Sequence, residues 1–274
     1  MAVDYDALAR AHMAKQVTDA AKIQAAMVRL WDETIDPADL TRSFALFRER
    51  ALPLIESGRS ISKGEAQRYF EAIHGVSGLS GDLADVYEKG WSPRYARSSL
   101  SYVAGNPLAR AEAIRRAGGD PTAELLKARE AVLGSAKRHV LNAGRERVIG
   151  LTKTTGYGRW ARVSDGAPCA FCLMLVGRGP VYTIDTASFR SHDRCGCSAR
   201  PVLATESGWS EQARQARALY REGNGLVGLR QILAERDAEE PTPAPVVPIR
   251  RLEPTEVDPA LALILARLVR ARAA

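Results

Sequence analysis

The sequence predicts an α+β protein that is mainly α-helical, with a helical N-terminal region, a small β-containing module near residues 151–203 and C-terminal helices. Ala and Arg are used heavily and aromatic residues make up only 6%, a mixture that favours helices over a β-sandwich. Apolar residues recur close to every 3.6 positions over the first 150 residues, as on one face of a helix. From about Gly150 this period fades and glycines become frequent, which predicts short strands.

The N-terminal region is predicted to hold three helices. Residues 4–30 form the first, and Asp36-Pro37 is expected to open the second, with Pro at its first helical position. Ser62 followed by Glu65 resembles a capping box and predicts the start of the third. The glycines that follow predict a loop at Gly75, Gly78 and Gly81.

Helices are expected to resume near Pro93, with a new start at Asn106-Pro107 and a stop at Gly118-Gly119. A long helix should begin at Asp120-Pro121. Its predicted apolar face is Leu125, Ala128, Val132, Ala136, Val140 and Ala143. Its other faces carry Lys127, Arg129, Lys137, Arg138, Arg145 and Arg147. This basic helix is therefore the predicted contact for an acidic partner.

The C-terminal half contains shorter predicted elements. Strands are expected at 160–163, 180–183 and 198–202, and a helix at 210–236 with Ser210 as its N-cap and a break at Gly223 and Gly225. Four prolines within residues 239–248 predict a stiff linker. Asp258-Pro259 is expected to open a short interaction helix within residues 249–274.

The positive charge is concentrated in the middle of the chain. Residues 94–200 contain 18 Lys/Arg against 8 Asp/Glu, a net of +10, whereas residues 1–93 contain 11 against 14. Such a block suits nucleic acid or an acidic protein, although solvated helix faces would give the same count. A membrane span is not expected, because no run of about 20 apolar residues occurs. The N-terminus lacks a secretory pattern, so we expect a reducing cytoplasm and free cysteines.

All four cysteines and one of the four histidines lie within 29 residues, as C-A-F-C at 169–172 and H-D-R-C-G-C at 192–197. A C-x2-C turn brings two thiolates to one zinc ion, which needs four ligands in a tetrahedron. The second half offers three more donors, so the candidate ligands are Cys169, Cys172, His192, Cys195 and Cys197. The spacing leaves open which four bind. Gly196 would permit an unusual backbone between the last two. A saturated site would be structural, since it keeps no position for water.

Two other interpretations of the cluster remain open. The cysteines could be buried free thiols, or they could act in thiol chemistry with Cys195 or Cys197 as nucleophile, His192 as base and Asp185 or Asp193 orienting the base. A catalytic zinc with three protein ligands is a further option. The sequence contains no H-E-x-x-H, G-x-S-x-G, P-loop or dinucleotide-binding motif. His12, His74 and His139 lie in helical patterns and are expected to be packing or surface residues.

The segment 151–203 resembles the phage Mu F-like minor head protein family, particularly its versions from phages and prophages of actinobacteria. The resemblance is carried by W-A-R-V at 160–163, D-G at 165–166, the C-A-F-C motif, R-G at 178–179, V-Y at 181–182 and the H-D-R-C-G-C motif. It implies a minor capsid protein with roles in head morphogenesis. Its implied partners are the portal protein, the major capsid protein and double-stranded DNA bound without sequence preference. Its implied location is the portal vertex of the virion, after assembly in the host cytoplasm.

This resemblance suggests a division of the chain into a helical portal- or capsid-contacting region (1–93), a MuF-like domain (94–238), the Pro-rich linker (239–248) and the interaction helix (249–274). Some relatives are labelled capsid maturation proteases, which is the alternative function. Ser191, Ser198 and His192 are close in sequence, but closeness is not the geometry of a triad. A third hypothesis is a zinc-containing DNA-binding module unrelated to virions, for which no recognition helix is evident.

Overall fold

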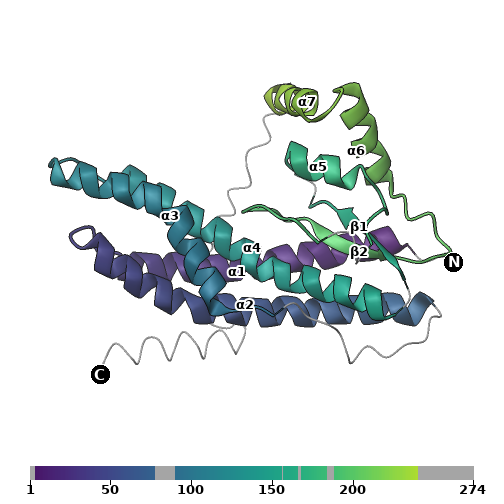
Figure 1. Ribbon diagram of the computed structural model, residues 1–274, viewed down its shortest axis with the longest axis horizontal. Helices are drawn as coiled ribbons and strands as arrows, with labels where there is room; N and C mark the ends of the chain where they lie inside the picture. Colours follow the sequence, from purple (N-terminus) through teal and green to yellow (C-terminus); the bar gives the residue numbers. More distant parts are fainter. Residues whose placement is uncertain (1–3, 78–89, 156, 166–167, 184–187, 240–274) are drawn as a thin grey trace.

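The computed structural model describes residues 4–77, 90–155, 157–165, 168–183 and 188–239. Four long helices build an elongated body: α1 (Tyr5–Thr34), α2 (Leu40–Ser77), α3 (Pro93–Arg116) and α4 (Thr122–Thr154). Helix α4 packs against the other three, and α1 lies along α2 (Figure 1). The predicted mainly helical fold with a small β component is confirmed.

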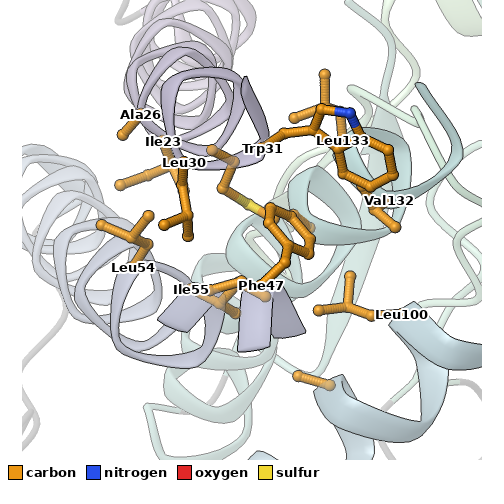
Figure 2. Close-up of a cluster of buried hydrophobic side chains, with 14 of the residues drawn as sticks. Ile23, Ala26, Leu30, Trp31, Phe47, Leu54, Ile55, Leu100, Val132 and Leu133 are labelled. Carbon is orange, nitrogen blue, oxygen red and sulfur yellow. The ribbon is translucent and has the colours of Figure 1, made fainter. Parts of the chain in front are cut away.

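One apolar cluster joins α1, α2 and α4 to Trp160, Val163 and Ala199 of the C-terminal part of the chain. All four helices contribute to a second and larger apolar core (Figure 2). Ile23 and Trp31 from α1, Phe47 from α2, Leu100 from α3 and Val132 from α4 are all buried in it. Each such side chain contributes roughly 1.5–3 kcal/mol when it leaves water. Because α3 and α4 share this core with α1 and α2, the helices on either side of residue 93 are packed as one unit.

Helix α2 differs from the sequence prediction because it continues through two expected boundaries. Ser62 is buried rather than capping a new helix, and its hydroxyl bonds with Gln16 of α1 at 2.5 Å while accepting from the Gly144 amide of α4 at 3.0 Å. Gly75 is likewise helical, so the loop predicted to begin there is wrong at that residue; Gly78 and Gly81 lie outside the described residues. Tertiary contacts outweigh local propensity here.

Two prolines also misled the prediction of helix starts. Helix α2 begins at Leu40, after a turn that contains Pro37, and Asp39 accepts the Arg42 amide at 3.1 Å as a side-chain cap. Pro107 lies inside α3 instead of opening a new helix. A proline costs a helix one backbone hydrogen bond, and the packing of α3 on α4 on both sides of this point offsets that cost.

A smaller C-terminal lobe follows the body, with β1 (Arg159–Val163), α5 (Ala170–Val176), β2 (Ser198–Val202), α6 (Glu211–Glu222) and α7 (Leu226–Glu239). The two strands are antiparallel, pairing Arg159 with Val202 and Val163 with Ser198. They pack on α1 and α4, while α5, α6 and α7 form a separate layer beyond them (Figure 1). The predicted strand at 180–183 is reduced to one bridge between Tyr182 and Trp160.

The helices of the lobe agree with the sequence prediction in part. Helix α5 begins inside the C-A-F-C motif and continues to Val176; it was not predicted, because seven residues are too few for a periodic pattern. Ser210 caps α6 as predicted, accepting the Ala213 amide at 3.1 Å, and the break near Gly223 is confirmed. The predicted linker at 239–248 starts at the last residue of α7, and its remainder and the helix at 249–274 lie outside the described residues.

Candidate metal centre

Two short segments bring the five predicted donors together. Cys169 is the N-cap of α5, with its thiol accepting the Cys172 amide at 3.5 Å, and Cys172 lies in the first turn of that helix. His192, Cys195 and Cys197 come from the segment that leads into β2. A helix start thus faces a strand start, and the donors of both segments point into the space between them.

The donor atoms form two overlapping groups of three that share Cys172. His192 Nε2 lies 3.1 Å from Cys169 Sγ and 3.2 Å from Cys172 Sγ. Cys172 Sγ lies 3.6 Å from Cys195 Sγ and within 4.8 Å of Cys197 Sγ. All four cysteines are free thiols, and Cys172, Cys195 and Cys197 are buried whereas Cys169 is exposed. The structure therefore collects more soft donors in one place than a single metal ion requires.

Within each group of three, the donors are about as far apart as neighbouring ligands of one zinc ion, whereas no four of the five lie within 4.8 Å of one another. Ligands at the usual zinc distances lie about 3.8 Å apart between sulfurs and about 3.6 Å apart between sulfur and nitrogen. The observed separations of 3.6 Å, 3.1 Å and 3.2 Å are close to those values. The other nitrogen of His192, Nδ1, lies 2.6 Å from the Asp193 carbonyl, which is the kind of partner that orients a metal-binding histidine.

The thiols influence one another because they are packed together away from water. The pKa of Cys195 is lowered by hydrogen bonds from Cys172 and Cys197 and by the nearby Arg145 guanidinium. The pKa of Cys172 is raised because its thiol donates to Cys195. Among the three buried thiols, hydrogen bonding therefore favours the thiolate, the form that a metal ion binds, at Cys195.

Arg145 of α4 is the residue at this site that the sequence analysis missed as a contributor. It is 2% exposed, and its guanidinium donates to the carbonyls of Cys195 and Cys197, at 2.7 Å each. One of its nitrogens also lies 3.7 Å from Cys195 Sγ. A buried cation beside sulfur offsets thiolate charge and fixes the loop that carries the thiols. The sequence could have indicated that Arg145 is buried, because the helical period places it on the same face of α4 as Leu141 and Val148, which are buried.

Arg162, Arg178 and Arg200 lie close to the cysteines in the sequence, but only one of them lies beside the cluster in the structure. Arg162 is buried, its guanidinium lies 3.8 Å from the centre of the Phe189 ring, and it donates to the Arg190 carbonyl at 2.8 Å. Arg200 instead pairs with Asp6 and Glu206, away from the thiols. Arg178 lines a different surface, beside α6.

Gly196 is required for space rather than for an unusual backbone, which corrects the sequence prediction. Its φ is not in the left-handed region, which along this segment is adopted by Arg194 at +67°. A Cβ at Gly196 would instead overlap the Asp165 carboxylate. Gly196 thus lets the chain pass close to the end of β1 between the two cysteines.

The geometry does not favour the predicted thiol chemistry. Cys195 and Cys197 are 3% and 2% exposed, and His192 Nε2 lies against Cys169 and Cys172. The Asp193 carboxylate is paired with Arg138 at 2.6 Å, and Asp185 lies outside the described residues. Ser198 is buried in β2, and Ser191 bonds with Asn142. The exposed thiol next to the imidazole is that of Cys169.

The cations of α4 also lie differently from the prediction of a basic helix face. Arg129 pairs with Asp32, Arg138 with Asp193 and Lys127 with Glu124, while Arg145 is buried. Lys137 lies near the thiols, and burial lowers its pKa. Because α4 is the central helix of the body, these cations form intramolecular ion pairs or are buried, and they do not form the predicted basic surface.

These observations define a mainly helical protein with a small C-terminal lobe organised around a Cys/His cluster. A family model described as VG15 protein matches residues 3–223, which include both the body and the cluster. The chain belongs to this phage protein family.

One characterised relative supports the same origin. The chain is similar to the Gene 15 protein of Mycobacterium phage D29, with 33% identity over 118 residues. That match covers 30% of this chain and 42% of the relative, so it spans less than half of the phage protein. No solved structure matches the chain. Within the described residues, none of the helices combines the length and apolar character needed to cross a membrane.

Proposed function

We propose that the chain is a minor capsid protein of a bacteriophage or prophage that acts in head morphogenesis at the portal vertex. The observation that carries this proposal is the match to the VG15 phage family along both the body and the lobe. The MuF-like motifs at 160–163, 169–172 and 192–197 add support from the sequence. The proposed partners are the portal and major capsid proteins and packaged double-stranded DNA, with assembly in the host cytoplasm and a final location in the virion.

The proposed cofactor is one structural zinc ion held by four of the five donors Cys169, Cys172, His192, Cys195 and Cys197. The short separations within each group of three donors support it, as does the orientation of His192 by the Asp193 carbonyl. When bound, zinc would supply a cross-link between α5 and the segment before β2. Arg145 would hold the backbone of that segment whether or not the ion is present, through its two carbonyl contacts.

Two measurements test these proposals. Mass spectrometry of purified heads of the phage that encodes the chain should find it in a small, fixed number of copies, and its absence from mature heads would contradict the virion role. Metal analysis of protein purified without added zinc should give one zinc per chain. Single substitutions of the five candidates would then identify the four ligands, because the fifth variant should keep its zinc.

The alternative function is a capsid maturation protease. The observation in its favour is the exposed Cys169 thiol, 3.1 Å from His192 Nε2. Purified chain would be incubated with the major capsid protein and the products examined for defined cleavage. Cleavage that is lost in Cys169→Ser, while the variant still contains zinc, would favour the enzyme over the structural protein.

A further inference from the structure

The lobe contains a second candidate site, on the side of α5 that faces α6. A cavity of about 480 Å³ opens there, and its lining includes Arg178 after α5, Trp209 before α6, and Arg217 and Arg221 on α6. Since Arg217 and Arg221 are four residues apart on one helix, their side chains extend from the same face. Three guanidinium groups thus share one groove, here called the arginine groove.

The charges of the three arginines in this groove are not balanced by nearby carboxylates of the described residues. Within the described part of the chain, none of Arg178, Arg217 and Arg221 forms an ion pair with a carboxylate, and all three are exposed. Their neighbour Arg214 shows the contrast, because it pairs with Glu211 at 2.9 Å. Holding three like charges together without a counter-charge is unfavourable, which is the pattern of a surface that receives an anion.

Trp209 holds the groove in shape. Its ring packs against Gly179, whose φ of +69° and lack of a side chain allow the approach. The guanidinium of Arg217 lies over the same ring, 5.0 Å from its centre. A planar guanidinium that rests on an aromatic ring keeps its edge N–H groups free and pre-oriented for bidentate contact with an anion. The ring is thus engaged with protein groups, and the arginines are the part of the groove that a ligand meets.

Much of the predicted basic block is paired within the molecule, although Arg94, Arg190 and Arg194 are exposed and have no carboxylate partner among the described residues. On α3, Arg97 pairs with Glu49, Arg110 with Glu124 and Arg116 with Glu112. The cations of α4 described above are paired or buried. The charge count of residues 94–200 therefore does not locate a surface for a polyanion, whereas the arginine groove gathers three guanidinium groups around one cavity, and two of its three arginines lie beyond residue 200.

We propose that the arginine groove binds the phosphodiester backbone of nucleic acid without regard to base sequence. Arginine forks match phosphate oxygens in pairs, and such contacts carry no sequence information. In its biological setting this inference rests on the proposed role at packaged DNA. An acidic segment of a partner protein is the competing occupant, and the experiment below separates the two.

The test uses the full chain, with its metal content verified, and a fluorescent 30-base-pair DNA duplex of mixed sequence titrated at several salt concentrations. The groove variant is R178Q/R217Q/R221Q. The matched control is R97Q/R110Q/R116Q, which removes the same charge from arginines that face glutamates. Losing three phosphate contacts should weaken binding at low salt by about tenfold or more and make the slope of log K against log salt shallower by about 2.7. The control should keep the wild-type slope.

Three outcomes would overturn the inference. The groove and control variants could lose affinity equally, which would reduce the effect to net charge. The groove variant could bind the duplex like wild type, which would place the contact elsewhere and leave the proposed head protein role standing. A poly-glutamate peptide could bind the groove of the wild type while the duplex does not, which would assign the groove to an acidic protein. Because the virion role is tested by the composition of heads, failure of either proposal is recognised separately.

Discussion

The body and the C-terminal lobe are stabilised in different ways. The body buries a large set of apolar side chains from four long helices, including Phe47, Leu54, Ile55 and Leu100, all at 0% exposure. The layer formed by α5, α6 and α7 has a smaller core in which Ala170, Ala213 and Ala216 take part. Alanines bury little area, so this layer gains less from apolar burial than the body does.

The lobe compensates with polar and sulfur contacts. The thiol cluster joins α5 to the segment before β2, Arg145 joins that segment to α4, and Arg200 pairs with Asp6 of α1 at 3.0 Å. The strands of the lobe also share an apolar cluster with the body through Trp160, Val163 and Ala199. The comparison therefore teaches that the thiol cluster and the layer of α5, α6 and α7 depend on a few specific groups, whereas the body depends on a distributed core. Removing one group should therefore affect the two regions very differently.

The largest expected effect is that of removing the proposed zinc ion. Cys172 belongs to both groups of donors, so Cys172→Ala should abolish zinc binding and unfold the lobe locally. A structural zinc site contributes on the order of 10 kcal/mol to small domains, so protection from hydrogen exchange in residues 169–202 should fall by orders of magnitude. Protection in α1 and α2 should stay unchanged. Phe171→Ala, at an exposed position of the same helix, is the control and should keep its zinc.

If Cys172→Ala instead kept full protection in the lobe, the cluster would be a set of packed thiols and the contrast between the two regions would disappear. Dialysis of the wild type against a strong chelator provides an independent check, since it should reproduce the effect of the variant without any change of side chain.

The next largest effect belongs to the body. Phe47 is fully buried, with its ring 5.1 Å from that of Trp31 in an edge-to-face arrangement. Phe47→Ala should lower the free energy of unfolding by about 3–5 kcal/mol, because it leaves a cavity that long helices cannot collapse. Leu46→Ala, at the adjacent 45% exposed position, should cost less than about 1 kcal/mol. Urea unfolding measures both, and equal losses would show that the core is not distributed as described.

The third prediction concerns pH and two buried histidines of the body. Burial lowers the pKa of His12 and of His139 to about 4 in each case. A histidine held neutral in the folded chain takes up its proton on unfolding, so its contribution is complete above pH 6.5 and is lost as the pH falls toward 4. Between pH 7.5 and 5 each should cost about 2 kcal/mol of unfolding free energy.

The measurement is urea unfolding of the wild type and of His12→Phe at several pH values. The phenylalanine ring can keep the stacking on Tyr69, where the ring centres are 4.2 Å apart. The variant should show a smaller loss of stability toward pH 5 than the wild type. The thiol cluster is the same in both proteins, so its own titration cancels in the difference, and parallel curves would show that His12 is not the source.

The body and the lobe also differ in how far the sequence determines them. The 3.6-residue pattern located the body helices and much of their apolar face, and the strands at 159–163 and 198–202 were found from composition. Helix boundaries failed at Ser62 and Pro107, where contacts between helices decide and local signals do not. The cluster was visible because its donors are close in sequence. Arg145 and Asp165 were not, because only the fold brings them to the thiols.

The sequence was least informative about which positively charged residues are available on the surface. A net of +10 over residues 94–200 predicted a basic surface, but a formal count cannot show which arginines face a glutamate within the fold. The arginine groove draws on residues from two segments that are 39 positions apart, Arg178 and Arg217, and its significance depends on the absence of acidic neighbours in the described part of the chain.

The smallest effect should come from the ion pair that joins the two regions. Arg200 of β2 is 3% exposed and contacts both Asp6 of α1 and Glu206 of its own lobe. Asp6→Asn removes only the contact between regions, at an expected cost of about 1 kcal/mol, because Glu206 still balances the buried guanidinium. Hydrogen exchange should therefore quicken in the first turns of α1 and in β2 together. In Glu206→Gln it should quicken in β2 alone, since Asp6 keeps its partner. If both variants changed only β2, Arg200 would be a contact within the lobe, and the two regions would be joined by apolar packing and by the contacts of Arg138 and Arg145.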